Sequence, residues 1–86
     1  MKVEVALFGA FREFDRRARI VVEVPDDARV AQLRQAGRAH GEANWPQFRA
    51  GLLASSAFAS RDAVLRDPEP VPADGCVVLL PPVSGG

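Results

Sequence analysis

The two ends of this chain carry its clearest strand patterns, and they constrain the fold more than any other feature. Near the N-terminus, Val3, Val5 and Leu7 alternate with Lys2, Glu4 and Ala6, which is the period-two pattern of a strand with one buried face. Near the C-terminus, residues 76–80 form an unbroken apolar run, typical of a strand covered on both faces in the middle of a sheet. The fold therefore has to accommodate both ends of the chain as strands, over residues 2–8 and 76–80.

A second strand follows the first after a short connection. Over residues 19–24, Ile20, Val22 and Val24 share one face. Residues 9–17 break the strand pattern and carry two phenylalanines among charged residues, so they are predicted to form a loop or single helical turn that packs one or both aromatic rings onto the core. The connection is short enough to join the two strands as a hairpin.

The main helix is predicted over residues 28–40, with Asp27 as its N-cap. Its apolar residues recur at helical spacing, and Arg34 is assigned to its polar face. A second, short helical segment is predicted to begin at Asn44 as cap, because Pro46 is tolerated in the first turn of a helix.

The segment between the helices and the last strand is predicted to add one or two strands. Residues 52–60 are interpreted as a third strand, and residues 63–65 are long enough for a short edge strand. The proline-rich stretch 67–72 must be a loop because proline has no amide donor for a sheet. Asp74 and Gly75 predict a turn before the last strand.

This order of elements predicts an α+β fold of the β-grasp type. In this arrangement a mixed sheet of four to five strands packs against one main helix, and the first and last strands lie side by side. A ferredoxin-like fold is less favoured, because it requires a second substantial helix between its last strands. We therefore predict a β-grasp domain over residues 1–80 and a flexible C-terminal tail over residues 81–86.

Composition narrows the classes of function. Eleven basic residues balance eleven acidic ones in 86 residues, so the net charge gives no reason to expect binding to nucleic acid or to an anionic membrane. Cys76 is the only cysteine and is expected to be a buried thiol. No apolar run is long enough for a transmembrane helix and the N-terminus does not look like a signal peptide, so a cytoplasmic location is expected. His40, the only histidine, has no neighbours at metal-ligand spacing, and no metal site is predicted.

The last six residues, 81–86, are the most specific functional signal. Pro81 and Pro82 separate the last strand from the ending Val83-Ser84-Gly85-Gly86. Glycines have no Cβ, so such an ending could pass through a narrow channel and present its carboxylate to a partner's active site. An ionised carboxylate is a poor electrophile, so this chemistry would require activation by another enzyme.

Four segments together resemble a known family. These are residues 5–8, 11–13, 30–33 and above all 79–86, which read Leu-Leu-Pro-Pro-Val-Ser-Gly-Gly. They resemble the small subunit of molybdopterin synthase, the MoaD-like branch of the ubiquitin-like sulfur carriers (MoaD/ThiS). The resemblance covers essentially the whole chain, and the two prolines before the Gly-Gly ending are its most specific part.

The resemblance implies a sulfur carrier for molybdenum cofactor biosynthesis. A ubiquitin-activating-type adenylyltransferase would use ATP to adenylate Gly86, and a sulfurtransferase would supply the sulfur for a C-terminal thiocarboxylate. That thiocarboxylate would donate sulfur to the pterin precursor in a complex with the large subunit of molybdopterin synthase. The chain alone would be non-catalytic, with no permanently bound cofactor, no nucleic acid and no membrane as partner.

The resemblance also implies a docking patch beside the tail. It would include Phe8, Phe11, Arg12 and Leu80, although packing in the core is the alternative for the apolar residues among them. Two other functions remain open: a ubiquitin-like modifier conjugated to proteins through Gly86, and a sulfur carrier for thiamine, cysteine or tRNA thiolation. The residues of the tail passage would be Pro81, Pro82, Val83, Ser84 and Gly85.

Overall fold

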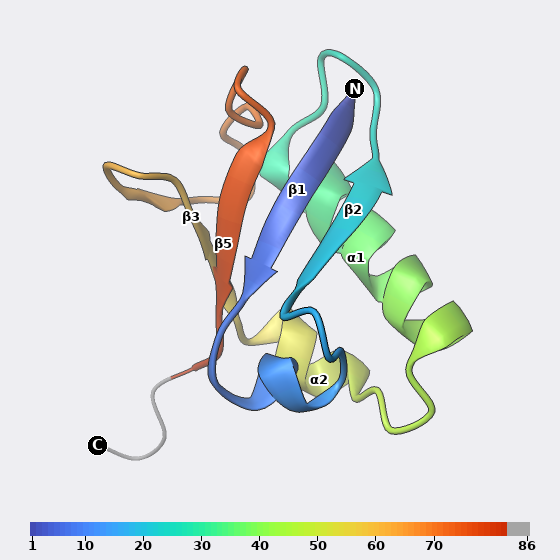
Figure 1. The fold of residues 1–86 in the computed structure, drawn as a ribbon. Coiled ribbons are helices and arrows are strands. Elements are labelled where there is room, and N and C mark those ends of the chain that lie inside the picture. The colour runs from blue at the N-terminus through green and yellow to red at the C-terminus, as the bar shows by residue number, and fades with distance from the viewer. Residues whose placement is uncertain (83–86) are drawn as a thin grey trace.

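The first and last strands of the chain lie side by side at the centre of one sheet, as the sequence predicts (Figure 1). The computed structural model describes residues 1–82. Strand β1 (Lys2–Leu7) runs parallel to β5 (Cys76–Leu80), with Val5 beside Val77 and Leu7 beside Leu79. Because β5 is central, the C-terminal segment leaves from the middle of the sheet.

Three further strands complete the sheet in the part of the chain that the structure describes. Strand β2 (Arg19–Glu23) pairs antiparallel with β1, and β3 (Ala57–Ala59) pairs antiparallel with β5. The two-residue strand β4 (Val64–Leu65) pairs with β3, which gives the order β2-β1-β5-β3-β4. This mixed sheet with one main helix confirms the predicted β-grasp fold.

The helices lie on one face of the sheet and enclose the core. Helix α1 (Val30–Asn44) packs across this inner face, while the 3-10 helix η1 (Gly9–Glu13) and the short helix α2 (Ala50–Ala54) close its lower end in Figure 1. The inward residues of β1, β2 and β5 meet Val30 and Leu33 of α1, both of which are fully buried. The alternation in the sequence therefore identifies the core face correctly.

Helix α1 begins later than predicted, and Asp27 does not cap it. Its N-cap is Arg29, and the N–H groups of Val30 and Ala31 donate to the carbonyls of Glu69 (2.8 Å) and Asp67 (3.0 Å). Carbonyl groups of a loop distant in sequence thus accept the hydrogen bonds that a capping side chain would otherwise accept from the first amides of the helix. At its other end the helix extends to Asn44, so the prediction that Asn44 caps a second helix is wrong.

The predicted third strand is also mostly wrong. Leu52 lies in α2, and only Ala57–Ala59 is extended. The Ser56 hydroxyl donates to the Leu52 carbonyl at 2.6 Å, which helps to end the helix at Ala54, two residues short of the strand. The short edge strand is confirmed as Val64–Leu65.

The outer face of β5 is open rather than covered. Val77 and Leu79 point into the core, whereas Val78 and Leu80 on the opposite face are only partly buried and Cys76 is exposed. The predictions of a strand covered on both faces and of a buried thiol are therefore wrong. Among residues 1–82, no helix is long and apolar enough to cross a membrane.

Arg34, assigned by the sequence to the polar face of the helix, makes contacts there that the sequence did not predict. Its Nη1 donates to the carbonyls of Leu53 (2.8 Å) and Ser56 (2.7 Å), and its Nη2 contacts Asp67 at 2.8 Å. The guanidinium also lies over the Phe58 ring, 5.2 Å from its centre. Arg34 therefore joins α1 to α2, β3 and the loop after β4.

Candidate functional site

The C-terminal segment leaves the domain where Pro81 packs against Gly9. Gly9 is the first residue of η1, two positions after the end of β1, and has a φ of +58°, a conformation that residues with a Cβ rarely adopt. A Cβ on Gly9 would lie 2.6 Å from Cγ of Pro81, so only glycine lets the proline ring come this close. The direction in which the chain leaves β5 is therefore set partly by a residue 72 positions earlier in the sequence.

Gly9 was not predicted as a site residue. The sequence feature that could have identified Gly9 is its position directly after the alternating strand predicted over residues 2–8. Because β1 and β5 are parallel and in register at Leu7 and Leu79, the residues that follow β1 lie beside those that follow β5. Once these two strands are paired, Gly9 and Pro81 necessarily become neighbours.

Two predicted docking residues, Phe8 and Leu80, lie at this exit, and a third, Arg12, lies on η1 three residues after Gly9. Phe8 is 48% exposed, Leu80 is partly buried, and Arg12 is exposed on η1. The register of β1 and β5 places Phe8 next to Leu80. We call this region the exit surface; its members are Phe8, Gly9, Arg12, Leu80 and Pro81.

Phe11, the fourth predicted docking residue, is not part of the exit surface. Its side chain is fully buried, so in this structure it belongs to the core and is not available to a partner. Phe14 meets Phe11 edge-on, with 6.1 Å between ring centres, and stacks on Trp45 at 5.3 Å. This aromatic cluster holds η1 in place, and η1 in turn carries Arg12 at the exit.

The remaining tail residues, Val83, Ser84, Gly85 and Gly86, lie outside the described residues. Pro82 is exposed. The described members of the exit surface are apolar apart from Arg12, and they include no carboxylate, histidine or thiol. Such a surface is suited to docking a partner and directing the chain end, whereas proton transfer or nucleophilic attack would need groups that it does not supply.

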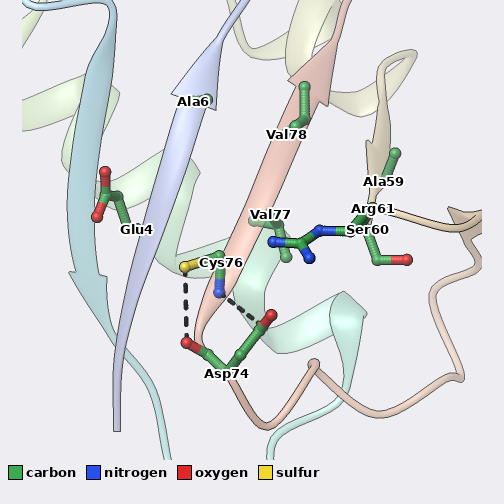
Figure 2. Close-up of a pocket in the computed structure, with 9 residues that line it drawn as sticks. All are labelled: Glu4, Ala6, Ala59, Ser60, Arg61, Asp74, Cys76, Val77 and Val78. Atoms are coloured by element: carbon green, nitrogen blue, oxygen red, sulfur yellow. Dashed lines mark hydrogen bonds between the residues drawn. The ribbon is translucent and has the colours of Figure 1, made fainter.

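A shallow hollow on the outer face of the sheet surrounds Cys76 (Figure 2). The Cys76 N–H donates to Asp74 Oδ1 at 3.1 Å, and its thiol lies 3.6 Å from the Asp74 carbonyl oxygen. Cys76 is four residues from Leu80 along an extended strand, about 13 Å from the exit. Within residues 1–82, no cluster of three or more His, Cys, Asp or Glu residues could hold a metal ion. The hollow is thus separate from the exit surface.

Comparison with known proteins gives one informative similarity. No protein-family model matches the chain, and no curated protein matches it. Among solved structures, the chain is similar to SAMP1 from Haloferax volcanii, with a TM-score of 0.73 and 25% sequence identity over 100% of both chains. The chain is therefore similar to SAMP1 over its whole length and shares its β-grasp fold.

Proposed function

We propose that this protein is a sulfur carrier that acts through the carboxylate of Gly86, as the small subunit of molybdopterin synthase. The observation that carries the proposal is the exit itself. A central strand delivers Pro81 onto Gly9, and the following Pro-Val-Ser-Gly-Gly sequence provides an ending without bulky side chains at its last two positions. The similarity to SAMP1 supports a ubiquitin-like function of this kind.

The chemistry would take place in partner active sites. The Gly86 carboxylate attacks the α-phosphate of ATP, so that pyrophosphate leaves and an acyl adenylate forms on an activating enzyme. Sulfide-level sulfur then displaces AMP and leaves a thiocarboxylate; if the donor is a persulfide, an acyl disulfide forms first and a thiol must cleave it, giving the thiocarboxylate and a disulfide. The thiocarboxylate transfers its sulfur to the pterin precursor on the large synthase subunit and returns to a carboxylate. This chain contributes the exit surface, which would hold the domain against each partner while the tail enters its active site.

The test is an intact-mass measurement after incubation with the activating enzyme, ATP and a sulfur source. The expected result is a mass increase equal to the difference between sulfur and oxygen. The same measurement on untreated protein from its natural source tests whether Gly86 is the terminal residue. A variant lacking Gly86 is the control, and it should keep its thermal stability but show no increase. No increase in the intact chain with an active enzyme would exclude the carrier function.

The step specific to molybdopterin is tested separately. Thiocarboxylated protein and the large synthase subunit should convert the pterin precursor to molybdopterin, whereas the carboxylate form should not. If sulfur is loaded but not transferred to the precursor, the carrier serves another acceptor, such as the thiamine, cysteine or tRNA pathways.

A second candidate is a modifier conjugated to proteins through Gly86, favoured by the full-length similarity to SAMP1. An acyl adenylate can be attacked by a lysine amine as well as by sulfur, so both functions begin with the same activation step. Immunoblots of cell extracts would show higher-mass conjugates that resist reducing agents if the protein is a modifier. Deleting Gly86 should remove those conjugates.

A further inference from the structure

Strand β2 forms the longer exposed edge of the sheet. It has β1 on one side only, and it contains five residues, whereas β4 at the opposite edge contains two. The backbone groups on the open side of an edge strand can pair with another extended segment, and short edges limit such pairing. The edge at β2 is therefore the one suited to extend the sheet.

The hydrogen bonds that flank the β1–β2 pair show which groups of β2 point outward. Met1 and Val24 exchange two bonds, from the terminal amine to the Val24 carbonyl (2.6 Å) and from the Val24 N–H to the Met1 carbonyl (3.0 Å). At the other end, the Leu7 N–H donates to the Ala18 carbonyl at 2.8 Å. Since antiparallel pairs alternate, the even-numbered residues of β2 bond to β1. The N–H and C=O groups of Arg19, Val21 and Glu23 therefore face outward, and within residues 1–82 no segment beyond the strand pair bonds to them.

This edge is complementary to itself. If two copies of β2 pair antiparallel about a two-fold axis at Val21, each Val21 faces its counterpart and each Arg19 faces Glu23 of the second copy. These three pairs would each exchange two backbone hydrogen bonds. Beyond the strand, the same two-fold axis places exposed Arg16 opposite exposed Asp26, which also binds the terminal amine of its own chain at 2.9 Å.

We propose that β2 is a self-association surface that joins two copies of this chain into one continuous antiparallel sheet. The exposed Val21, 55% accessible in the single chain, lies at the centre of the interface. A parallel arrangement would place Arg19 near Arg19 and Glu23 near Glu23, so like charges disfavour it. A closed two-fold pairing also uses the edge completely, which leaves no open β2 to recruit a third copy.

The surroundings of β2 leave room for the second copy. A shallow groove beside the strand is lined by Arg17, Ile20 and Val21 together with His40 of α1. Helical spacing places Ala36 and Ala43 on the same side of α1 as His40, so small side chains face the edge next to the groove. Strand β1 separates β2 from β5, so the pairing leaves both exit surfaces uncovered.

The first test uses the wild-type chain and measures amide chemical shifts by NMR from dilute solution to about 1 mM, a range chosen because so small an interface should be weak. The amides of Arg19, Val21 and Glu23 should shift with concentration, while those of Ile20 and Val22 should change little. Analytical ultracentrifugation should show a monomer–dimer equilibrium over the same range. A chain that stays monomeric, or shifts that do not alternate, would overturn the proposal.

The second test exchanges charges across the two-fold axis. Arg19→Glu alone and Glu23→Arg alone should each weaken dimerisation by about tenfold or more, because each places like charges opposite one another at two positions. An equimolar mixture of the two variants should form a heterodimer, since both ion pairs are then restored. Arg61→Glu is the matched control; Arg61 is exposed and lines the hollow around Cys76, and its reversal should not change dimerisation.

Arg19 also contacts Glu4 of its own chain at 2.5 Å, so thermal unfolding must show that each variant is folded. If Arg19→Glu does not fold, Glu23→Arg and the wild-type shifts still decide the question. Single variants that dimerise as strongly as wild type would overturn the proposal. So would an edge whose amides respond only to an added acidic extended peptide, because β2 would then serve another partner.

Discussion

The contact between Gly9 and Pro81 predicts that Gly9→Ala will destabilise the domain and displace the root of the tail. Alanine at a φ of +58° costs about 1–2 kcal/mol, because its Cβ crowds the following carbonyl. The same Cβ would lie 2.6 Å from Pro81 Cγ, and relieving that overlap adds about 1 kcal/mol or more. The expected loss is therefore about 2–3 kcal/mol, which lowers the unfolding midpoint by roughly 8–24 °C in a domain of this size.

Two variants separate the causes of this loss. Gly9→Asn keeps the overlap with Pro81 but reduces the backbone strain, because asparagine tolerates the left-handed region, so it should cost about 1 kcal/mol. Gly51→Ala is the matched control, since no atom lies within 4 Å of its added Cβ and Gly51 is within α2. It should stabilise the chain by about 0.5–1 kcal/mol.

The assays are urea denaturation for stability and NMR of the Pro81 ring for its position. Gly9→Ala and Gly9→Asn should both shift the Pro81 resonances, and Gly51→Ala should not. At a temperature where all variants are folded, both Gly9 variants should also slow ATP-dependent activation of the C-terminus. Wild-type stability in Gly9→Ala would refute the strain argument, and unchanged Pro81 resonances in both variants would refute the contact.

The remaining predictions concern side chains whose role the structure reassigns or specifies. Phe11→Ala should cost about 3–5 kcal/mol in thermal unfolding. Phe8→Ala should cost less than about 1 kcal/mol because Phe8 is half exposed; its larger effect should be weaker binding to the activating enzyme in titration calorimetry. Arg34→Met should cost about 2–3 kcal/mol in urea denaturation, because it removes the donor to the Ser56 carbonyl, one of two donors to the Leu53 carbonyl, and the ion pair with Asp67. Arg38→Met, which breaks an exposed ion pair with Glu42, should cost under about 0.5 kcal/mol. The Cys76 thiol should react with a maleimide in the native chain, and Cys76→Ser should change stability by less than about 0.5 kcal/mol; slow labelling that requires unfolding would contradict its exposure.

The positions of β1 and β2 were predictable because alternation reflects burial directly. Val3, Val5 and Leu7 all point into the core, as do Ile20 and Val22, and the pairing of the first and last strands follows from placing both in one sheet. The β-grasp fold could therefore be derived from residue patterns before any comparison was made.

The boundaries of α1 could not be predicted, because they depend on contacts distant in sequence. Asp27 is a good capping residue by type, yet the amides of Val30 and Ala31 are satisfied by carbonyls of the proline-rich loop. The contacts of Arg34 could not be predicted for the same reason, since its partners lie in α2, directly before β3 and after β4. Local sequence patterns do not indicate hydrogen-bond acceptors that lie far away along the chain.

The apolar run of β5 led to the wrong prediction that both faces of the strand are buried. The reason for this error concerns the candidate site. An apolar strand predicts two covered faces only when enough chain is available to cover both, and here the helices of the described chain all lie on the inner face. The outer residues Val78 and Leu80 are consequently left partly accessible beside Phe8, in a protein whose last strand leads into the tail. The core of the domain does not need the side chain of Leu80. Its position next to the exit therefore favours contact with a partner over a role in folding. The partly accessible outer face of β5 and the predicted docking patch therefore meet at the exit surface. Weaker binding of Phe8→Ala to the activating enzyme would support its role in docking.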